Sequence, residues 1–180
     1  VVDPMCGSGT FVIEAAEIAS GLAPGRSRGF AFEHLATFDP EAWAHLRAVA
    51  PAATALRFHG HDRDAGAITT SRANAARAGV GAITLFTRQP ISDLCPPDGP
   101  PGLVVVNPPY GGRIGERRLL YALYGTMGQV LRDRFSGWRV GLVTSDPALA
   151  AATGLPFGDP GAAFSNGGIP VRLYRTAALR

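Results

Sequence analysis

The chain has 180 residues, 46% of them hydrophobic and 17% charged, and this composition is typical of one folded domain rather than of a disordered segment. It contains no run of eighteen apolar residues, which argues against a membrane-spanning helix. The net charge is +3, and every basic residue is arginine. Arginine suits contacts with phosphate, so the charge gives modest support to a nucleic-acid partner, although GC-rich coding bias also explains the absence of lysine.

The cysteines and the first residues indicate the cellular compartment of the chain and its place in a longer protein. Cys6 and Cys95 stand in unrelated sequence contexts, so we expect reduced thiols and a cytoplasmic location. The sequence does not begin with Met but with Val1-Val2-Asp3, which reads as the end of a strand. We therefore expect residues 1–180 to be the C-terminal domain of a longer protein.

The first segment predicts a strand, a glycine turn and a helix. Residues 1–3 end the strand, residues 4–10 form a turn of small residues, and residues 11–19 have the pattern of a helix that stops near Gly21. Glycines let the backbone approach a ligand closely, and a helix N-terminus supplies N–H donors. This order of elements, with Asp3 at the strand end, is the layout of a nucleotide-cofactor loop.

Residues 22–38 are rich in Gly, Pro and Arg and predict a long surface loop. Such a loop is either an ordinary insertion or a lid that faces the substrate. Residues 40–50 place Trp43, Leu46 and Val49 at helical spacing. This pattern predicts a short amphipathic helix with Trp43 and Leu46 in the core.

The second strand ends on a carboxylate. Residues 56–61 alternate in polarity and lead to Asp62. A carboxylate at the end of the second strand of such a sheet is placed to accept hydrogen bonds from both hydroxyls of a ribose. Asp64 is expected to be the N-cap of a helix over residues 65–78, and Gly79 is expected to end this helix.

Two histidines, His59 and His61, alternate along this second strand. A metal ion needs further ligands at suitable spacing, and no third ligand is present nearby. We therefore interpret both histidines as ordinary strand residues and expect no metal site.

The next segments continue the alternation. Strands are expected over residues 83–86, 103–106 and 137–144, and helices over residues 116–135 and 146–152. On the longer helix, apolar residues recur at steps of three and four, so we expect this face in the core. The face consists of Leu119, Leu120, Leu123, Tyr124, Met127, Val130 and Leu131.

The C-terminal segment predicts an antiparallel hairpin. Residues 156–164 and 170–175 can pair through Asn166-Gly167-Gly168, a hairpin signal. Strands that alternate with helices and close on such a hairpin predict an α/β fold. Its sheet is mostly parallel, with helices on both faces.

The most distinctive stretch is Asn107-Pro108-Pro109-Tyr110, directly after the apolar run 103–106. It lies at the carboxyl end of a strand, where open α/β sheets bind ligands. The prolines fix the backbone and donate no N–H, so the Pro108 carbonyl points in a fixed direction. An amide oxygen, a fixed carbonyl and an aromatic ring suit a planar base with an exocyclic amine. The alternative is a rigid surface turn.

The stretch Asp3-Pro4-Met5-Cys6-Gly7-Ser8-Gly9-Thr10, followed by Ile13-Glu14-Ala15-Ala16 and later by Asn107-Pro108-Pro109-Tyr110-Gly111, carries a specific resemblance. Together these motifs resemble the S-adenosylmethionine-dependent methyltransferase domain of the THUMP-containing RNA guanine-N2 methyltransferases. The resemblance covers essentially the whole chain and is nearest to enzymes that form N2-methylguanosine in 23S rRNA or in the tRNA acceptor stem. It implies a Rossmann-like class I methyltransferase fold, S-adenosyl-L-methionine as cofactor, RNA as partner, and an RNA-binding region that precedes this catalytic domain.

The resemblance also implies a role for each motif. The glycine turn lines the methionine and ribose part of the cofactor, Asp62 binds the ribose hydroxyls, and Arg63 lies beside the adenine. Asn107, Pro108, Pro109 and Tyr110 hold the target base, and Asn107 also borders the cofactor. The turn residues are Asp3, Pro4, Met5, Cys6, Gly7, Ser8, Gly9 and Thr10. We interpret Cys6 as a small packing residue rather than a nucleophile, because no base stands beside it.

One position departs from the family pattern. The family usually has an Asp after the third strand that contacts the adenine amine, and here that position is Pro90. Gln89 or Asp93 is expected to substitute. The change puts the affinity for the cofactor in question.

The implied mechanism is alignment. The lone pair of guanine N2 is delocalised, so the amine is a poor nucleophile. When the Asn107 amide oxygen and the Pro108 carbonyl accept both N–H groups, the lone pair turns toward the sulfonium methyl, and transfer is an in-line displacement without a dedicated general base. Alignment can contribute ~7–11 kcal/mol, and stacking on Tyr110 recovers ~1–3 kcal/mol of the cost of extruding the base.

Three arginines, Arg113, Arg117 and Arg118, follow the base-holding motif. They either contact RNA phosphates or form the solvated face of the long helix. Two other functions stay open at this point. The same loop serves N6-adenine methylation of DNA or methylation of a protein glutamine, and Pro90 leaves room for a non-catalytic RNA- or cofactor-binding module.

Overall fold

The computed structural model describes residues 1–48, 52–110 and 117–180. In these ranges, seven strands form one sheet in the order β3-β2-β1-β4-β5-β7-β6. All neighbours from β3 to β5 pair in parallel, whereas β7 runs antiparallel to both β5 and β6. The strands are β1 (Val2–Asp3), β2 (Phe58–Asp62), β3 (Thr84–Arg88), β4 (Leu103–Val106), β5 (Arg139–Thr144), β6 (Phe164–Asn166) and β7 (Ile169–Arg175).

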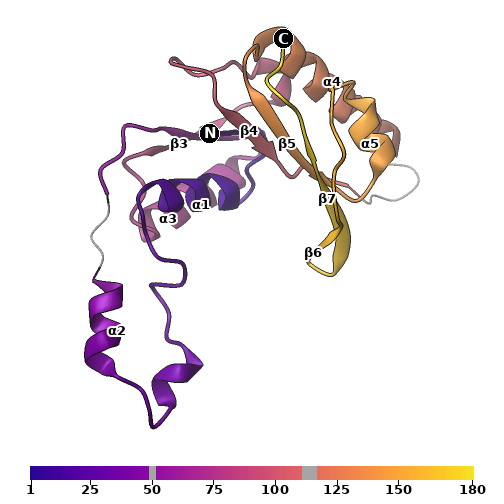
Figure 1. The fold of residues 1–180 in the computed structure, drawn as a ribbon. Coiled ribbons are helices and arrows are strands. Elements are labelled where there is room, and N and C mark those ends of the chain that lie inside the picture. Colours follow the sequence, from indigo (N-terminus) through magenta and orange to yellow (C-terminus); the bar gives the residue numbers. More distant parts are fainter. Residues whose placement is uncertain (49–51, 111–116) are drawn as a thin grey trace.

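Helices cover the two faces of this sheet (Figure 1). α1 (Thr10–Ala19) and α3 (Ala65–Arg77) pack with β2 and β3, while α4 (Arg117–Arg134) and α5 (Pro147–Ala152) pack with β4 and β5. Each of these groups of helices and strands forms its own hydrophobic core. Val1 packs against the core of α1 and α3, whereas Val2 is part of the core of α4 and α5. Because consecutive strand residues point to opposite faces, the two cores lie on opposite sides of β1. The predicted α/β sheet with helices on both faces is therefore confirmed.

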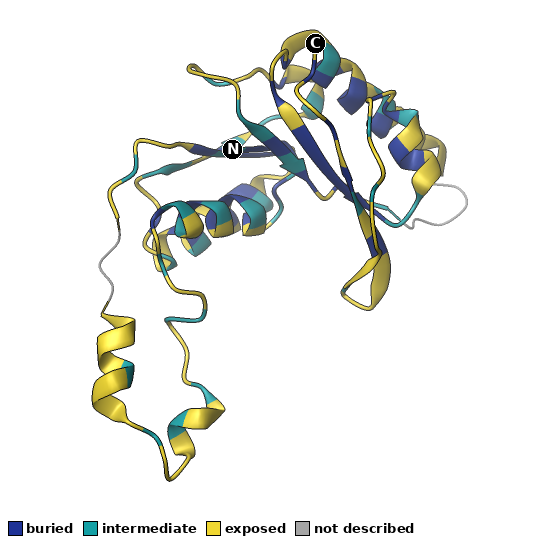
Figure 2. Ribbon diagram, in the orientation of Figure 1, coloured by how far each residue is buried: buried dark blue, intermediate teal, exposed yellow. Residues whose placement is uncertain are grey.

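A long excursion between α1 and β2 forms an arm. It contains a 3-10 turn, η1 (Ala31–His34), and α2 (Pro40–Arg47), and it projects from the body of the domain (Figure 1). The Ala52 N–H donates to the Ser20 carbonyl at 2.8 Å, and this backbone bond ties the two ends of the arm together. Figure 2 shows the arm as mostly exposed, and neither main core contains a residue of η1 or α2.

The arm contradicts one expectation of core packing. Leu46 is 64% exposed, and Trp43 packs instead on Phe30 and Phe32, with ring centroids 5.6 and 4.9 Å away. The amphipathic pattern therefore predicted the helix correctly but not what covers its apolar side. Val49 lies outside the described residues.

Two further expectations need correction. Leu119 is 70% exposed, although the rest of the predicted face of α4 is buried or half-buried. It lies in the first turn of α4 and lines a surface cavity instead of the core. The segment 156–164 is not a continuous strand. Phe157 makes an isolated bridge to Thr176, and pairing resumes only at Phe164.

Candidate functional site

The turn after β1 is built by backbone hydrogen bonds and one glycine. The Cys6 N–H donates to the His61 carbonyl at 2.9 Å, and the Asp3 Oδ1 accepts from the Met5 N–H at 3.0 Å. Gly9 is the N-cap of α1 with a φ of 88°, and a Cβ there would lie 2.9 Å from the Ser71 Cβ. This turn therefore requires glycine both for its backbone and for its packing.

Asp62, at the end of β2, is joined to this turn. Its Oδ2 accepts from the Gly7 N–H at 3.0 Å and its Oδ1 from the Asp64 N–H at 2.9 Å. A carboxylate has about four acceptor positions, and the bonds within the described residues use two of them. Asp64 caps α3 as predicted, with its Oδ1 accepting from the Ala67 N–H at 2.7 Å.

The loop 107–110 follows β4 and is held from two sides. The buried Tyr124 hydroxyl on α4 lies 3.3 Å from the Pro109 carbonyl oxygen and 3.4 Å from the Thr144 Oγ1. The Asn166 Nδ2 of β6 donates to the Tyr110 hydroxyl at 2.7 Å. Within the described part of the chain, no hydrogen bond uses the Pro108 carbonyl.

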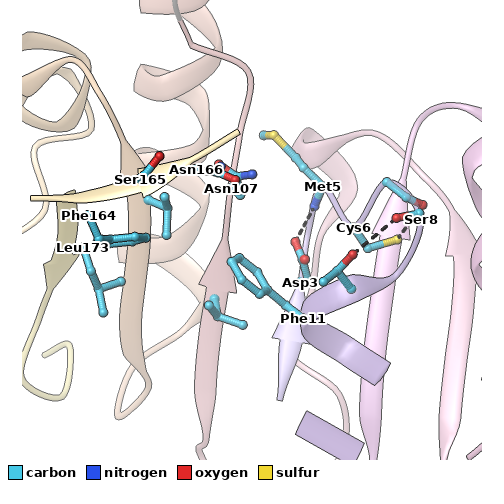
Figure 3. Close-up of a pocket in the computed structure, with 14 residues that line it drawn as sticks. Asp3, Met5, Cys6, Ser8, Phe11, Asn107, Phe164, Ser165, Asn166 and Leu173 are labelled. Atoms are coloured by element: carbon cyan, nitrogen blue, oxygen red, sulfur yellow. Dashed lines mark hydrogen bonds between the residues drawn. The ribbon is translucent and has the colours of Figure 1, made fainter. Parts of the chain in front are cut away.

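Two adjoining cavities open beside these loops. The first, of about 530 Å³, lies between the turn after β1 and the β6–β7 hairpin, and Figure 3 shows its residues. The second, of about 760 Å³, lies between Asp62, the β3–β4 connection and α4. Met5 and Asn107 line both cavities, so the glycine turn and the Asn-Pro-Pro-Tyr loop share one site.

The cavities bring together most of the residues predicted from the sequence. The first contains Asp3, Met5, Cys6, Gly7, Ser8, Thr10 and Asn107. The second contains Pro4, Met5, Asp62, Arg63, Asn107 and Pro109. Three predicted residues are not part of these linings: Gly9 is a packing glycine, Pro108 is buried, and Tyr110 is half-buried against the core.

The first cavity also has lining residues that the sequence analysis missed. Phe11 opens α1, and Phe164, Ser165 and Asn166 come from β6. In Figure 3 the Phe164 side chain lies on the hairpin side of the cavity, and the ring of Phe11 lies between it and the Asp3 turn. The Asn-Gly-Gly hairpin signal located β6, but nothing in the sequence placed that strand over the first turn.

Burial sets the electrostatics of the first cavity. Burial, together with the nearby charge of Asp62, raises the pKa of Asp3 to about 7, although the Met5 N–H opposes the shift. Burial and the charges of Asp3 and Asp62 raise the pKa of Cys6 to about 12. Cys6 is buried and stays a thiol at neutral pH, which agrees with its interpretation as a packing residue rather than a nucleophile.

The histidines of β2 stay neutral near pH 7. Burial and the neighbouring His59 lower the pKa of His61 to about 4, and the rings of His59 and His61 stack at 6.5 Å. Among the described residues, no group of three His, Cys, Asp or Glu side chains could hold a metal ion.

The residues around Pro90, where the sequence departs from the family pattern, line the second cavity. Gln89, Pro90, Ile91 and Ser92 line it, and the Gln89 N–H donates to the Asp62 carbonyl oxygen at 2.9 Å. Asp93 is not part of this lining, and its Oδ1 accepts from the Ser92 Oγ at 3.0 Å. Of the two substitutes expected for the missing Asp, Gln89 is therefore the one that reaches the cavity.

The arginines after the loop have different settings. Arg117 lies 3.4 Å from the Asp146 carboxylate and is exposed, as is Arg118, whereas Arg113 lies outside the described residues. An exposed ion pair of this kind contributes little to stability. Both described side chains are therefore accessible to a polyanion.

The arrangement suits two different ligand parts that meet at Asn107. The second cavity offers the Asp62 carboxylate, the Gln89 amide and apolar α4 side chains, which fit a nucleoside with a free diol. The first offers Phe11, Phe164 and the Asn107 amide, which fit a planar ring with polar edges. Each volume lies in the range of about 300–1,000 Å³ that is usual for small-molecule sites.

Known proteins resemble this chain over nearly its whole length. The ribosomal RNA large subunit methyltransferase K/L of Chromohalobacter salexigens is 39% identical over 183 residues, covering 96% of this chain and 25% of that protein. Its namesake from Allochromatium vinosum is 42% identical over 163 residues, covering 86% of this chain and 22% of that protein. The chain thus spans about a quarter of the length of these curated relatives.

A solved structure and a family model agree with these relatives. SMU.472, assigned as a methyltransferase and crystallised with SAH, superposes with a TM-score of 0.88 at 31% identity, covering 99% of this chain and 48% of that one. The model described as "RMKL-like, methyltransferase domain" matches residues 1–159. No helix in the described ranges is long and apolar enough to cross a bilayer. The chain therefore belongs to the RMKL-like methyltransferase domain family.

Proposed function

We propose that this chain is the catalytic domain of an RNA methyltransferase that uses S-adenosyl-L-methionine to methylate the exocyclic N2 of guanosine in large-subunit ribosomal RNA. The observation that carries the proposal is that Asn107 lines both cavities, so a base held by Asn107 adjoins a cofactor held by the glycine turn. The names of the relatives favour ribosomal RNA over tRNA.

The second cavity and the glycine turn fit the cofactor. Asp62 has acceptor capacity left for the ribose hydroxyls, and Arg63, Gln89 and Pro90 border the space for the adenine. Asp3 faces the first cavity and suits the ammonium group of the methionine part. When bound, the cofactor supplies a methyl group activated by a positively charged sulfur.

The loop 107–110 holds the amine of the target base. The Asn107 side-chain oxygen and the Pro108 carbonyl accept its two N–H groups, which localises the nitrogen lone pair and fixes its direction. The Tyr124 hydroxyl next to the Pro109 carbonyl steadies this loop. Because the acceptors are oriented before the base arrives, they stabilise the positive charge that develops on nitrogen.

The Asn107→Ala substitution tests this role. We expect it to lower the turnover number by about 10²–10³-fold, the usual cost of losing one oriented hydrogen-bonding group at a reacting atom, while the Kd for S-adenosylmethionine measured by calorimetry changes little. A matched control is Gln129→Ala, on the exposed side of α4, where the amide hydrogen-bonds to Asp133 and Arg132. Full activity of Asn107→Ala would contradict the assignment of the base-holding role.

A further inference from the structure

The β6–β7 hairpin brings a polar side chain into the first cavity. Asn166 pairs with Ile169 across the turn Gly167–Gly168, whose φ values are 58° and 84°. Positive φ at both central residues matches the two-residue turn that suits the twist of a hairpin. The turn thereby fixes the last residue of β6, and Asn166 lines the cavity together with Asn107; Figure 3 shows the two side chains.

The Asn166 amide is hydrogen-bonded to Tyr110 through its nitrogen. The Asn166 Nδ2 donates to the Tyr110 hydroxyl at 2.7 Å, so the other end of the amide, Oδ1, presents an acceptor. Among the hydrogen bonds of the described residues, none uses this oxygen. A half-buried acceptor without a protein partner gains most from a ligand that donates to it.

Guanine carries a suitable donor next to the amine that reacts. Its N1–H stands beside the exocyclic N2 on the same edge, so a base whose N2 is held by Asn107 presents N1–H to the same cavity. Adenine has a lone pair at N1 instead, which an amide oxygen repels. Building on the function proposed above, we propose that the Asn166 Oδ1 accepts the guanine N1–H and that Asn166 is the residue that selects guanine.

In this arrangement the β6–β7 hairpin and Tyr110 together position the oxygen that contacts the base. The bond from the Asn166 Nδ2 to the Tyr110 hydroxyl leaves Oδ1 for the base, and the same bond holds the Tyr110 ring beside the loop. A site built to hydrogen-bond a donor rejects analogues without it, because its own acceptor is then left unpaired. Discrimination therefore arises from one oriented oxygen rather than from the size of the cavity.

The test uses an oligoribonucleotide that contains the nucleotide methylated by the wild-type protein, with guanosine, 2-aminopurine or inosine at that position. 2-Aminopurine keeps the amine at C2 but has no N1–H and no O6, and inosine has no amine. The ratio of kcat/KM for guanosine to that for 2-aminopurine measures selectivity. The ratio of the two Kd values, measured with S-adenosylhomocysteine present, reports the same preference without turnover.

We expect wild-type protein to prefer guanosine over 2-aminopurine by about tenfold to a hundredfold and to leave inosine unmethylated. Asn166→Ala lowers both ratios by about tenfold or more, and the preference that remains in that variant is the contribution of O6. Asn166→Asp keeps the preference, because a carboxylate oxygen still accepts N1–H. Ile169→Ala, which trims the exposed residue paired with Asn166, also keeps it.

The failures of the two proposals are distinguishable. An Asn166→Ala variant that methylates guanosine and still rejects 2-aminopurine as strongly as wild type overturns the role of Asn166 but leaves the proposed function intact. Loss of selectivity in Ile169→Ala as well would show that the shape of the hairpin, not the Asn166 oxygen, selects the base. Wild-type protein that never methylates guanosine N2 overturns the proposed function itself.

Discussion

The fold moves the pKa of Asp3 close to neutral pH. It is 3% exposed and its pKa is raised to about 7, mainly by burial. Between its usual pKa near 3.8 and pH 7, the unfolded chain has lost this proton while the folded chain keeps it. The free energy of unfolding contributed by Asp3 is therefore highest below pH 4 and falls as the pH rises to 7.

Asp3→Asn tests this linkage. We expect the variant to gain stability relative to wild type as the pH rises from about 4 to 7, with no further relative gain above the raised pKa. Urea unfolding of both proteins at several pH values measures the difference. The comparison isolates Asp3 because the pKa of His61, lowered to about 4 by burial, acts in the opposite direction in both proteins. A difference that does not change with pH would show that Asp3 is ionised throughout.

At the scale of elements, α4 and α5 meet through a glycine. An ideal Cβ on Gly128 would overlap the Thr153 carbonyl oxygen, whereas one on Gly125, a turn earlier, would lie 3.9 Å from the Ala152 carbonyl oxygen. The two glycines stand in the same helix, but only Gly128 is needed for close packing. Helix propensity alone favours alanine at both positions by up to ~1 kcal/mol.

The pair Gly128→Ala and Gly125→Ala separates packing from propensity. We expect Gly128→Ala to lower the free energy of unfolding by about 1–3 kcal/mol, the usual cost of overpacking a core. Gly125→Ala should leave it unchanged or raise it by a few tenths of a kcal/mol. Chemical denaturation measures both, and equal destabilisation by the two substitutions would refute the close α4–α5 contact.

Local patterns predicted some elements well because their causes are local. The run 103–106 matches β4 at both ends, since β-branched residues bounded by Gly and Pro leave little choice. Asp64 was identified as a cap for a similar reason. Leu46 was wrongly placed in the core, because periodicity tells which side of a helix is apolar but not whether another element covers that side.

At the scale of the whole molecule, the site depends on segments that are far apart in sequence. Parallel strands bring the turn after β1, Asp62 and the loop after β4 to one edge of the sheet, which is why most site residues could be predicted from strand ends. Phe11, Phe164 and Asn166 could not, because their part in the cavity arises only when the antiparallel hairpin folds over α1. Among its described residues, the arm supplies no lining residue to either cavity, although Arg26 and Ser27 lie beside Ser8 and Thr10 of the glycine turn in a separate, smaller pocket.

The identity of the methylated product tests the central claim most directly. The protein is incubated with S-adenosylmethionine carrying a labelled methyl group and, in separate reactions, with large-subunit ribosomal RNA, tRNA, DNA and protein, and the RNA is then digested to nucleosides for mass spectrometry. The account predicts labelled N2-methylguanosine from the ribosomal RNA. Label found only in DNA or protein, or in RNA on an atom other than guanine N2, would contradict it.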